Sequence, residues 1–122
     1  MMTDTPNSHD GELEEVILGA CLIERASMPL IADKVRPEMF YDERHGEIFA
    51  ALLSMHREGK SIDIITVKNE LAVRGKLDFV GGPCRLASIS SRVASSAHLE
   101  YHALILRQLY TRREMRLGFQ RL

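Results

Sequence analysis

Signals that begin and end helices recur along the whole of this 122-residue chain, and they constrain its fold more than any other feature. Asp10, Asp42 and Asp63 each precede an apolar segment, where an aspartate side chain can accept hydrogen bonds from the free N–H groups of a first helical turn. Gly59 and Gly75 follow such segments, as glycine does at the C-terminal ends of helices. No segment alternates apolar and polar residues for long enough to build a sheet. The chain is therefore predicted to be all-α.

The spacing of the apolar residues predicts about six helices, arranged as a compact orthogonal bundle. They are expected from residue 12 onward and over residues 27–35, 43–57, 64–74, 83–91 and 97–121. The expected core stripe of the third helix consists of Ile48, Phe49, Leu52, Leu53 and Met55. Cys21 and Cys84 lie on apolar helices far apart in the sequence, so both are expected to be buried, reduced thiols.

The last helix is expected to be longer than a small domain needs, because each residue adds about 1.5 Å. Its first half is apolar on most faces and is expected to pack on the domain. After Thr111 only one apolar stripe remains, formed by Met115, Phe119 and Leu122 at positions i, i+4 and i+7. A single stripe on a protruding helix predicts self-association, or order that depends on a partner.

Charge is distributed unevenly along the chain, although the formal net charge is only −1. Residues 107–122 hold five arginines and one glutamate, so the rest of the chain carries a net charge of −5. Only the last helix could therefore attract DNA phosphates, and DNA binding is expected to be weak or absent. These arginines could equally form a solvated helix face, or lie against acids of a second helix or subunit. Glu12, Glu14 and Glu15 fit the dipole of a first helical turn, or an acidic patch for a basic partner.

Motifs for catalysis and metal binding are mostly absent. The sequence has no GxxxxGK[ST] loop to hold nucleotide phosphates and no CxxC pair. His98 and His102 flank Glu100 in the order HLEYH, which points the carboxylate away from the face that the histidines share, unlike HExxH. His45 is expected to serve packing or the hydrogen bonds of a first helical turn. We therefore expect no catalytic, cofactor-binding or metal-binding residue in this chain.

Nothing in the sequence suggests a location outside the cytoplasm. No apolar run approaches the roughly 18 to 20 residues that span a bilayer, so no membrane partner is expected. The first residues, MMTDTPNSHDGE, are polar and acidic, unlike a secretory signal or a basic transit peptide. We expect a cytoplasmic protein whose residues 1–10 form a disordered lead-in.

Several short elements follow one another in a distinctive order. They are Val16-Ile17-Leu18-Gly19, Phe40-Tyr41, His45 with Ile48-Phe49, Gly59 through Ile62-Asp63, Thr66-Val67, Gly75-Lys76-Leu77, Gly81-Gly82 and Tyr101-His102-Ala103. From about Asn7 to Glu114 this pattern resembles the N-terminal domain of the bacterial replicative DNA helicase, DnaB. No single element is specific to that family, whereas their order and spacing together are.

The resemblance implies a domain from a homo-hexameric ring that hydrolyses ATP to unwind DNA at the replication fork. In that family the ATPase domain, which binds ATP and Mg²⁺, lies C-terminal to this region. The chain itself would be non-catalytic, with a helical domain over residues 11–96 and the start of a collar hairpin over residues 97–122. The domain would support hexamer assembly and recruit the primase, DnaG, and a helicase loader is a further implied partner.

Family contacts with primase involve the start of the first helix, the helix after the Gly-Gly turn, and the hairpin. The matching positions here are Glu12, Arg85 and Arg116. Arg85 stands where the family pattern usually has an aromatic residue, and Arg116 where it often has an aliphatic one. An alternative function from another class is a free-standing DNA-binding or regulatory helical module. A continuation of the reading frame that contains a P-loop would favour the helicase reading over this alternative.

Overall fold

The computed structural model of the chain describes residues 10–92 and 96–120. Within these residues it contains seven α-helices, one 3₁₀ helix and no strand, which confirms the predicted all-α class. The helices are α1 (Gly11–Ile23), α2 (Ser27–Ile31), the 3₁₀ helix η1 (Pro37–Met39), α3 (Glu43–Arg57), α4 (Ile64–Val73), α5 (Leu77–Val80), α6 (Gly82–Ser91) and α7 (Leu99–Gln120). No described helix combines the length and the apolar content needed to cross a membrane.

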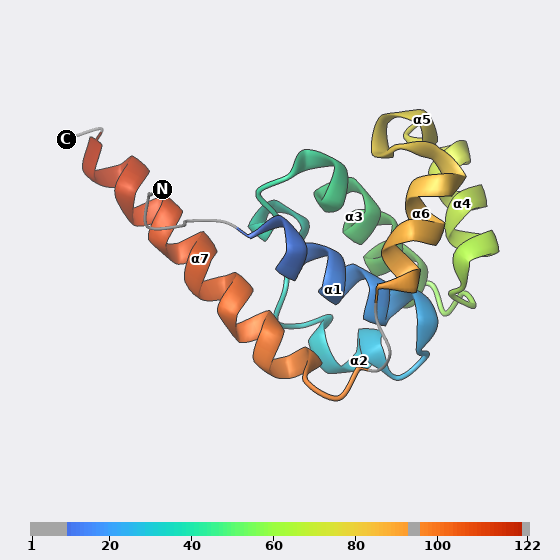
Figure 1. The fold of residues 1–122 in the computed structure, drawn as a ribbon, viewed down its shortest axis with the longest axis horizontal. Coiled ribbons are helices and arrows are strands. Elements are labelled where there is room, and N and C mark those ends of the chain that lie inside the picture. Colours follow the sequence, from blue (N-terminus) through green and yellow to red (C-terminus); the bar gives the residue numbers. More distant parts are fainter. Residues whose placement is uncertain (1–9, 93–95, 121–122) are drawn as a thin grey trace.

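Helix α1 lies in the middle of the body, and it packs against α2, α3, α6 and α7 (Figure 1). Nine of its thirteen residues are buried, as expected for a helix that has neighbours on several sides. Ile17 and Leu18 are fully buried, and the predicted core stripe of α3 packs in the same core. Helix α7 runs along the body and projects beyond it, while α4 and α5 lie at the opposite end (Figure 1). The body is therefore organised around α1.

The predicted helix boundaries are confirmed where a capping residue sets them. Asp10, Asp42 and Asp63 each accept a hydrogen bond from a backbone N–H in the first turn of α1, α3 and α4. Gly59 and Gly75, which follow α3 and α4, have φ angles of 71° and 73°. Only glycine adopts this left-handed conformation without a steric penalty, which explains why both helices stop there.

Three features differ from the prediction by more than one residue. Helix α2 ends at Ile31, and residues 32–34 continue as turns, while the N–H groups of Lys34 and Val35 both donate to the Ile31 carbonyl. Helix α5 was not predicted, because one turn is too short to show helical periodicity. Helix α7 begins at Leu99, two residues later than expected. Ser95 and Ser96 precede this helix and are both of a residue type that caps helices, but Ser95 lies outside the described residues.

The two cysteines lie in opposite environments. Cys21 is 1% exposed, as predicted, and burial raises the pKa of its thiol to about 12. Cys84 is exposed, so the prediction that it is buried is wrong. It lies in the first turn of α6, whose buried side instead carries Leu86 and Ile89.

This difference predicts two classes of thiol reactivity. We expect DTNB to modify Cys84 in the folded chain and Cys21 only after local or global unfolding, with rates that differ by a factor of at least about 1,000, because an accessible thiolate is the reacting species. The release of thionitrobenzoate, followed in native buffer and in denaturant, measures both rates. A Cys84→Ser chain is the control and should lose the fast phase. A fast phase that persists in it would contradict the burial of Cys21.

Candidate functional site

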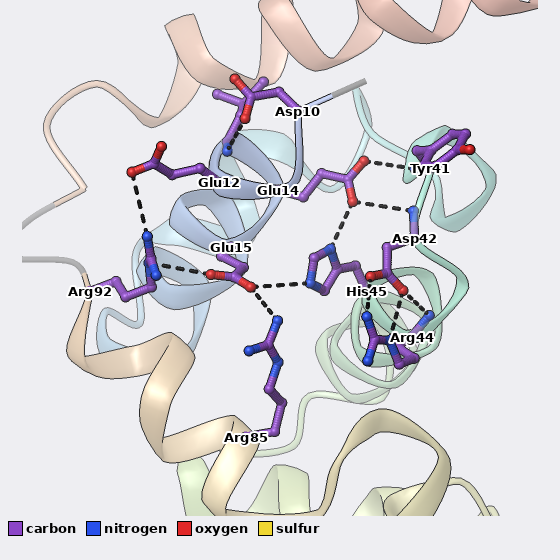
Figure 2. Close-up of polar contacts among 11 residues, drawn as sticks. Asp10, Glu12, Glu14, Glu15, Tyr41, Asp42, Arg44, His45, Arg85 and Arg92 are labelled. Atoms are coloured by element: carbon purple, nitrogen blue, oxygen red, sulfur yellow. Dashed lines mark hydrogen bonds and ion pairs between the residues drawn. The ribbon is translucent and has the colours of Figure 1, made fainter. Parts of the chain in front are cut away.

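Glu14 occupies the first turns of α1, and its side chain is buried at the junction with the segment that enters α3. The carboxylate is 1% exposed. It accepts hydrogen bonds from the backbone N–H groups of Tyr41, at 2.7 Å, and Asp42, at 3.3 Å (Figure 2). Nδ1 of His45 lies 2.7 Å from the same carboxylate, a distance that fits a donated hydrogen bond. Glu14 therefore joins α1 to the start of α3 through three contacts.

Glu15 points to the other side of α1 and joins it to α6 (Figure 2). Its carboxylate forms ion pairs with the guanidinium groups of Arg85 and Arg92, the latter at 3.3 Å. Arg92 also lies 3.4 Å from the exposed carboxylate of Glu12. Nε2 of His45 is 3.7 Å from Glu15, and among the described residues it is the buried side-chain nitrogen that lacks a hydrogen-bond partner. His45 thus lies between the two glutamates.

This polar network (Glu12, Glu14, Glu15, His45, Arg85 and Arg92) corrects two expectations. Glu14 and Glu15 are buried and paired within the chain, so they do not form an open patch for a basic partner, although Glu12 and Glu14 do lie in the first turn of α1, where the helix dipole favours acids. His45 is buried as expected, but it contacts α1 rather than serving the first turn of its own helix. The signal that was missed is the mostly apolar run from Val16 to Ile23, which gives α1 apolar residues on several faces and predicts neighbours on several sides.

The start of α3 holds a second, more exposed ion pair next to this network. Asp42 caps the helix through the N–H of Arg44, and the guanidinium of Arg44 also hydrogen-bonds to the Asp42 carboxylate, at 2.8 Å. The Arg44 hydrogen bond holds the pKa of Asp42 down at about 2. The cap therefore stays charged through the neutral range.

The outer face of α7 is the main exposed apolar surface of this helix. Leu99, Ala103, Leu106 and Leu109 are buried against the body. On the opposite side Tyr101, Leu104 and Met115 are 63%, 49% and 69% exposed. Together with Gln108 and Thr111 they alternate spacings of three and four residues, which places all five in one stripe along the helix, called here the outer stripe. Arg107 and Arg112 flank it and help to line a shallow groove of about 530 Å³.

The outer stripe partly corrects the expectations for the last helix. Met115 is exposed, and its role in self-association stays a prediction. The side chain of Phe119, like the whole of Leu122, lies outside what the structure describes. The stripe already begins at Tyr101, whereas the first half of the helix was expected to pack on the domain throughout. The described residues contain no group of three or more His, Cys, Asp or Glu side chains that could hold a metal ion.

The family model for the DnaB-like helicase N-terminal domain matches residues 6–108, which is most of the chain. This chain belongs to the DnaB-like helicase N-terminal domain family.

Curated DnaB proteins are similar to the chain over most of its length. The replicative DNA helicase DnaB of Rhodothermus marinus is 40% identical over 102 residues, which cover 84% of this chain and 11% of that protein. The replicative DNA helicase DnaB of Geobacillus stearothermophilus is 33% identical over 97 residues, covering 80% of this chain and 21% of that protein. The chain thus spans about a tenth to a fifth of the length of these DnaB relatives.

Two solved DnaB structures have the same arrangement of helices. The N-terminal domain of DnaB helicase from Mycobacterium tuberculosis aligns with a TM-score of 0.89 and 28% identity, over 94% of this chain and 83% of that one. A DnaB-like replicative helicase, described together with its interactions with primase, aligns with a TM-score of 0.77 and 24% identity, over 91% of this chain and 26% of that one. At that identity the second match shows the fold alone.

The three positions that the family resemblance predicts for contact with primase lie in different surroundings. Glu12 is exposed on the first turn of α1, with its side chain 75% accessible. Arg85 is half-buried and already paired with Glu15. Arg116 is exposed on α7 and has no ion pair among the described residues. The polar network links Glu12 and Arg85 through Arg92 and Glu15, whereas Arg116 belongs to the projecting part of α7.

Proposed function

We propose that this chain is the non-catalytic assembly and recruitment domain of a replicative DNA helicase. The observation that carries the proposal is the outer stripe, an apolar face on a helix that projects from a folded body, in a chain of the DnaB N-terminal family. A projecting helix with one apolar face is stabilised when a second helix covers that face. Such a helix suits a protein that joins subunits rather than one that binds a small substrate.

In the whole helicase this domain would contribute to the collar of a homo-hexamer. Residues 11–96 would form the compact unit and residues 97–122 the first part of the collar hairpin. Met115, Phe119 and Leu122 remain the proposed self-association residues, and the exposed side chains of Tyr101 and Leu104 extend the same proposal towards the body. ATP and Mg²⁺ would bind to a separate C-terminal ATPase domain. The helicase would act in the cytoplasm, where it would also meet a helicase loader.

Primase is the second proposed partner. Support comes from Glu12, Arg85 and Arg116 at the positions that the family resemblance assigns to primase contacts, and from a DnaB-like helicase of the same fold that is described together with its interactions with primase. Glu12 and Arg116 are the more accessible of the three, because the Arg85 guanidinium already pairs with Glu15. We therefore expect Glu12 and Arg116 to contribute more to primase binding than Arg85 does.

Primase binding can be tested with charge reversals. We expect Glu12→Lys combined with Arg116→Glu to weaken the binding of this chain to the primase of the same organism by at least about tenfold, a loss of roughly 1.4 kcal/mol. Isothermal titration calorimetry measures the affinity. Arg57→Glu is the matched control, because Arg57 is exposed at the far end of α3. Equal affinities for the double variant and the wild type would remove Glu12 and Arg116 from the interface, and a wild-type chain that binds no primase would contradict the recruitment role.

A further inference from the structure

Among the described residues, Arg113 makes the last hydrogen bond between helix α7 and the body. Arg113 donates a hydrogen bond to the backbone carbonyl of Met39, at 2.8 Å, which joins α7 to η1. Its guanidinium carbon also lies 5.5 Å from the ring centroid of Tyr41 and 5.8 Å from that of Tyr110. A planar guanidinium can stack on aromatic faces and still donate hydrogen bonds in its own plane. A lysine ammonium is not planar and cannot stack in this way. One side chain thus contacts two rings and a carbonyl.

The partners of Arg113 are themselves held by the body. The N–H of Tyr41 donates to buried Glu14, which fixes the backbone that carries the ring. Arg36 lies 5.9 Å from the centroid of the Tyr110 ring, and hydrogen bonds to Glu38 and Tyr110 raise the pKa of Arg36. Arg113 therefore binds to a preformed surface of η1 and its neighbours.

Beyond Arg113 the described side chains of the helix make no comparable contact. All residues from Glu114 to Gly118 are exposed. The buried apolar side chains of α7 end at Leu109, one turn before Arg113. Without Arg113, no contact among the described residues would hold the exposed segment beyond its continuity with the helix before it, and helix ends that lack tertiary contacts fray.

We infer that Arg113 is a positioning residue, which together with Tyr41, Tyr110 and the Met39 carbonyl forms a clamp that fixes the direction in which residues 114–120 of α7 leave the body. Only the consequence of this inference rests on the proposed function: if α7 joins subunits, its direction sets where the collar forms relative to each body. The clamp itself is a property of this chain alone, and it can be measured without any partner.

Arg112 offers a matched control, because it is the neighbouring arginine, is exposed, and lines the groove on the outer face of the helix. Spin labels are placed at Asn69→Cys on α4 and Leu117→Cys on α7 in a Cys84→Ser chain, where buried Cys21 stays unlabelled. Electron–electron double resonance then reports the distribution of distances between the body and the end of α7. We expect Arg113→Ala to widen this distribution at least twofold and Arg112→Ala to leave it unchanged.

Hydrogen exchange gives a second readout on unlabelled chains. With Arg113→Ala the amides of residues 110–117 are expected to exchange at least tenfold faster, while those of α1 and α3 keep their rates. Tyr41→Leu should have the same effect, and Arg113→Lys an intermediate one, since lysine keeps the charge but not the planar stack. The clamp is overturned if Arg113→Ala and Arg112→Ala give the same distance distribution and the same exchange rates. The assembly role is tested separately through the outer stripe, so the two ideas can fail independently.

Discussion

Replacing Glu14 by alanine is expected to lower the free energy of unfolding by about 3–5 kcal/mol, the largest stability effect of any single substitution in the polar network. The carboxylate is buried and accepts from His45 and from the backbone N–H groups of Tyr41 and Asp42. Alanine would leave these donors inside the body without an acceptor, and each buried donor left unpaired costs about 1–3 kcal/mol. Since domains of this size are stable by only about 5–15 kcal/mol, much of the variant should be unfolded at moderate temperature.

Chemical denaturation followed by circular dichroism measures this loss. Glu12→Ala is the control, because Glu12 is exposed on the same helical turn, and its loss should cost less than about 1 kcal/mol. In a double-mutant cycle, Glu14→Ala combined with His45→Ala should lower the free energy of unfolding by less than the sum of the two single substitutions. The double variant removes both partners, so neither is left unpaired in the body. If Glu14→Ala and Glu12→Ala proved equally stable, Glu14 would not hold α1 to α3.

Glutamates introduced into the outer stripe are expected to have the largest effect on assembly. Leu104→Glu with Met115→Glu should weaken self-association through α7 at least about 100-fold, or roughly 2.7 kcal/mol, because a helix that covers the stripe would have to bury two unpaired charges. The melting temperature of the body should barely change, since both side chains are exposed in the single chain. Sedimentation velocity over a range of concentrations, on this chain and on the whole helicase, measures the association.

A matched substitution elsewhere separates this effect from a general effect of charge. Val73 on α4 is 86% exposed, so Val73→Glu makes the same kind of change away from α7. It should leave both association and melting unchanged. If the stripe variant instead unfolds the body, the outer stripe belongs to the core. Equal association of wild type, stripe variant and control would mean that α7 does not join subunits.

Features that depend on residues close together in the sequence could be predicted, whereas those that depend on residues far apart in the sequence could not. Helix starts are determined within a few residues, and the caps at Asp10, Asp42 and Asp63 were all predicted correctly. The polar network depends on partners that lie far apart in the chain. Glu14 and His45 are 31 residues apart, and Glu15 and Arg85 are 70 apart. No local pattern indicates such pairs, because their meeting depends on how the helices pack.

The exposed face of α7 was predicted in part for a related reason. A single stripe stands out after Thr111, where the rest of the helix is polar, but it is hidden in the first half by apolar residues on the body side. Only the packing of Leu106 and Leu109 on the body shows that Leu104 points the other way. Likewise, five arginines in one segment look alike in the sequence, although Arg113 binds the body and Arg112 does not.

The carboxylate of Glu15 has a consequence for how this surface can change during evolution. It is contacted by Arg85, Arg92 and His45, so the placement of all three side chains depends on the charge of Glu15. An aromatic residue introduced at position 85, where the family pattern usually has one, would remove a cation and leave a largely buried carboxylate with fewer partners. Such a change should be tolerated only after Glu15 has become neutral. Positions 15 and 85 are therefore expected to covary among relatives, and the order in which the two mutations can be fixed is constrained by epistasis.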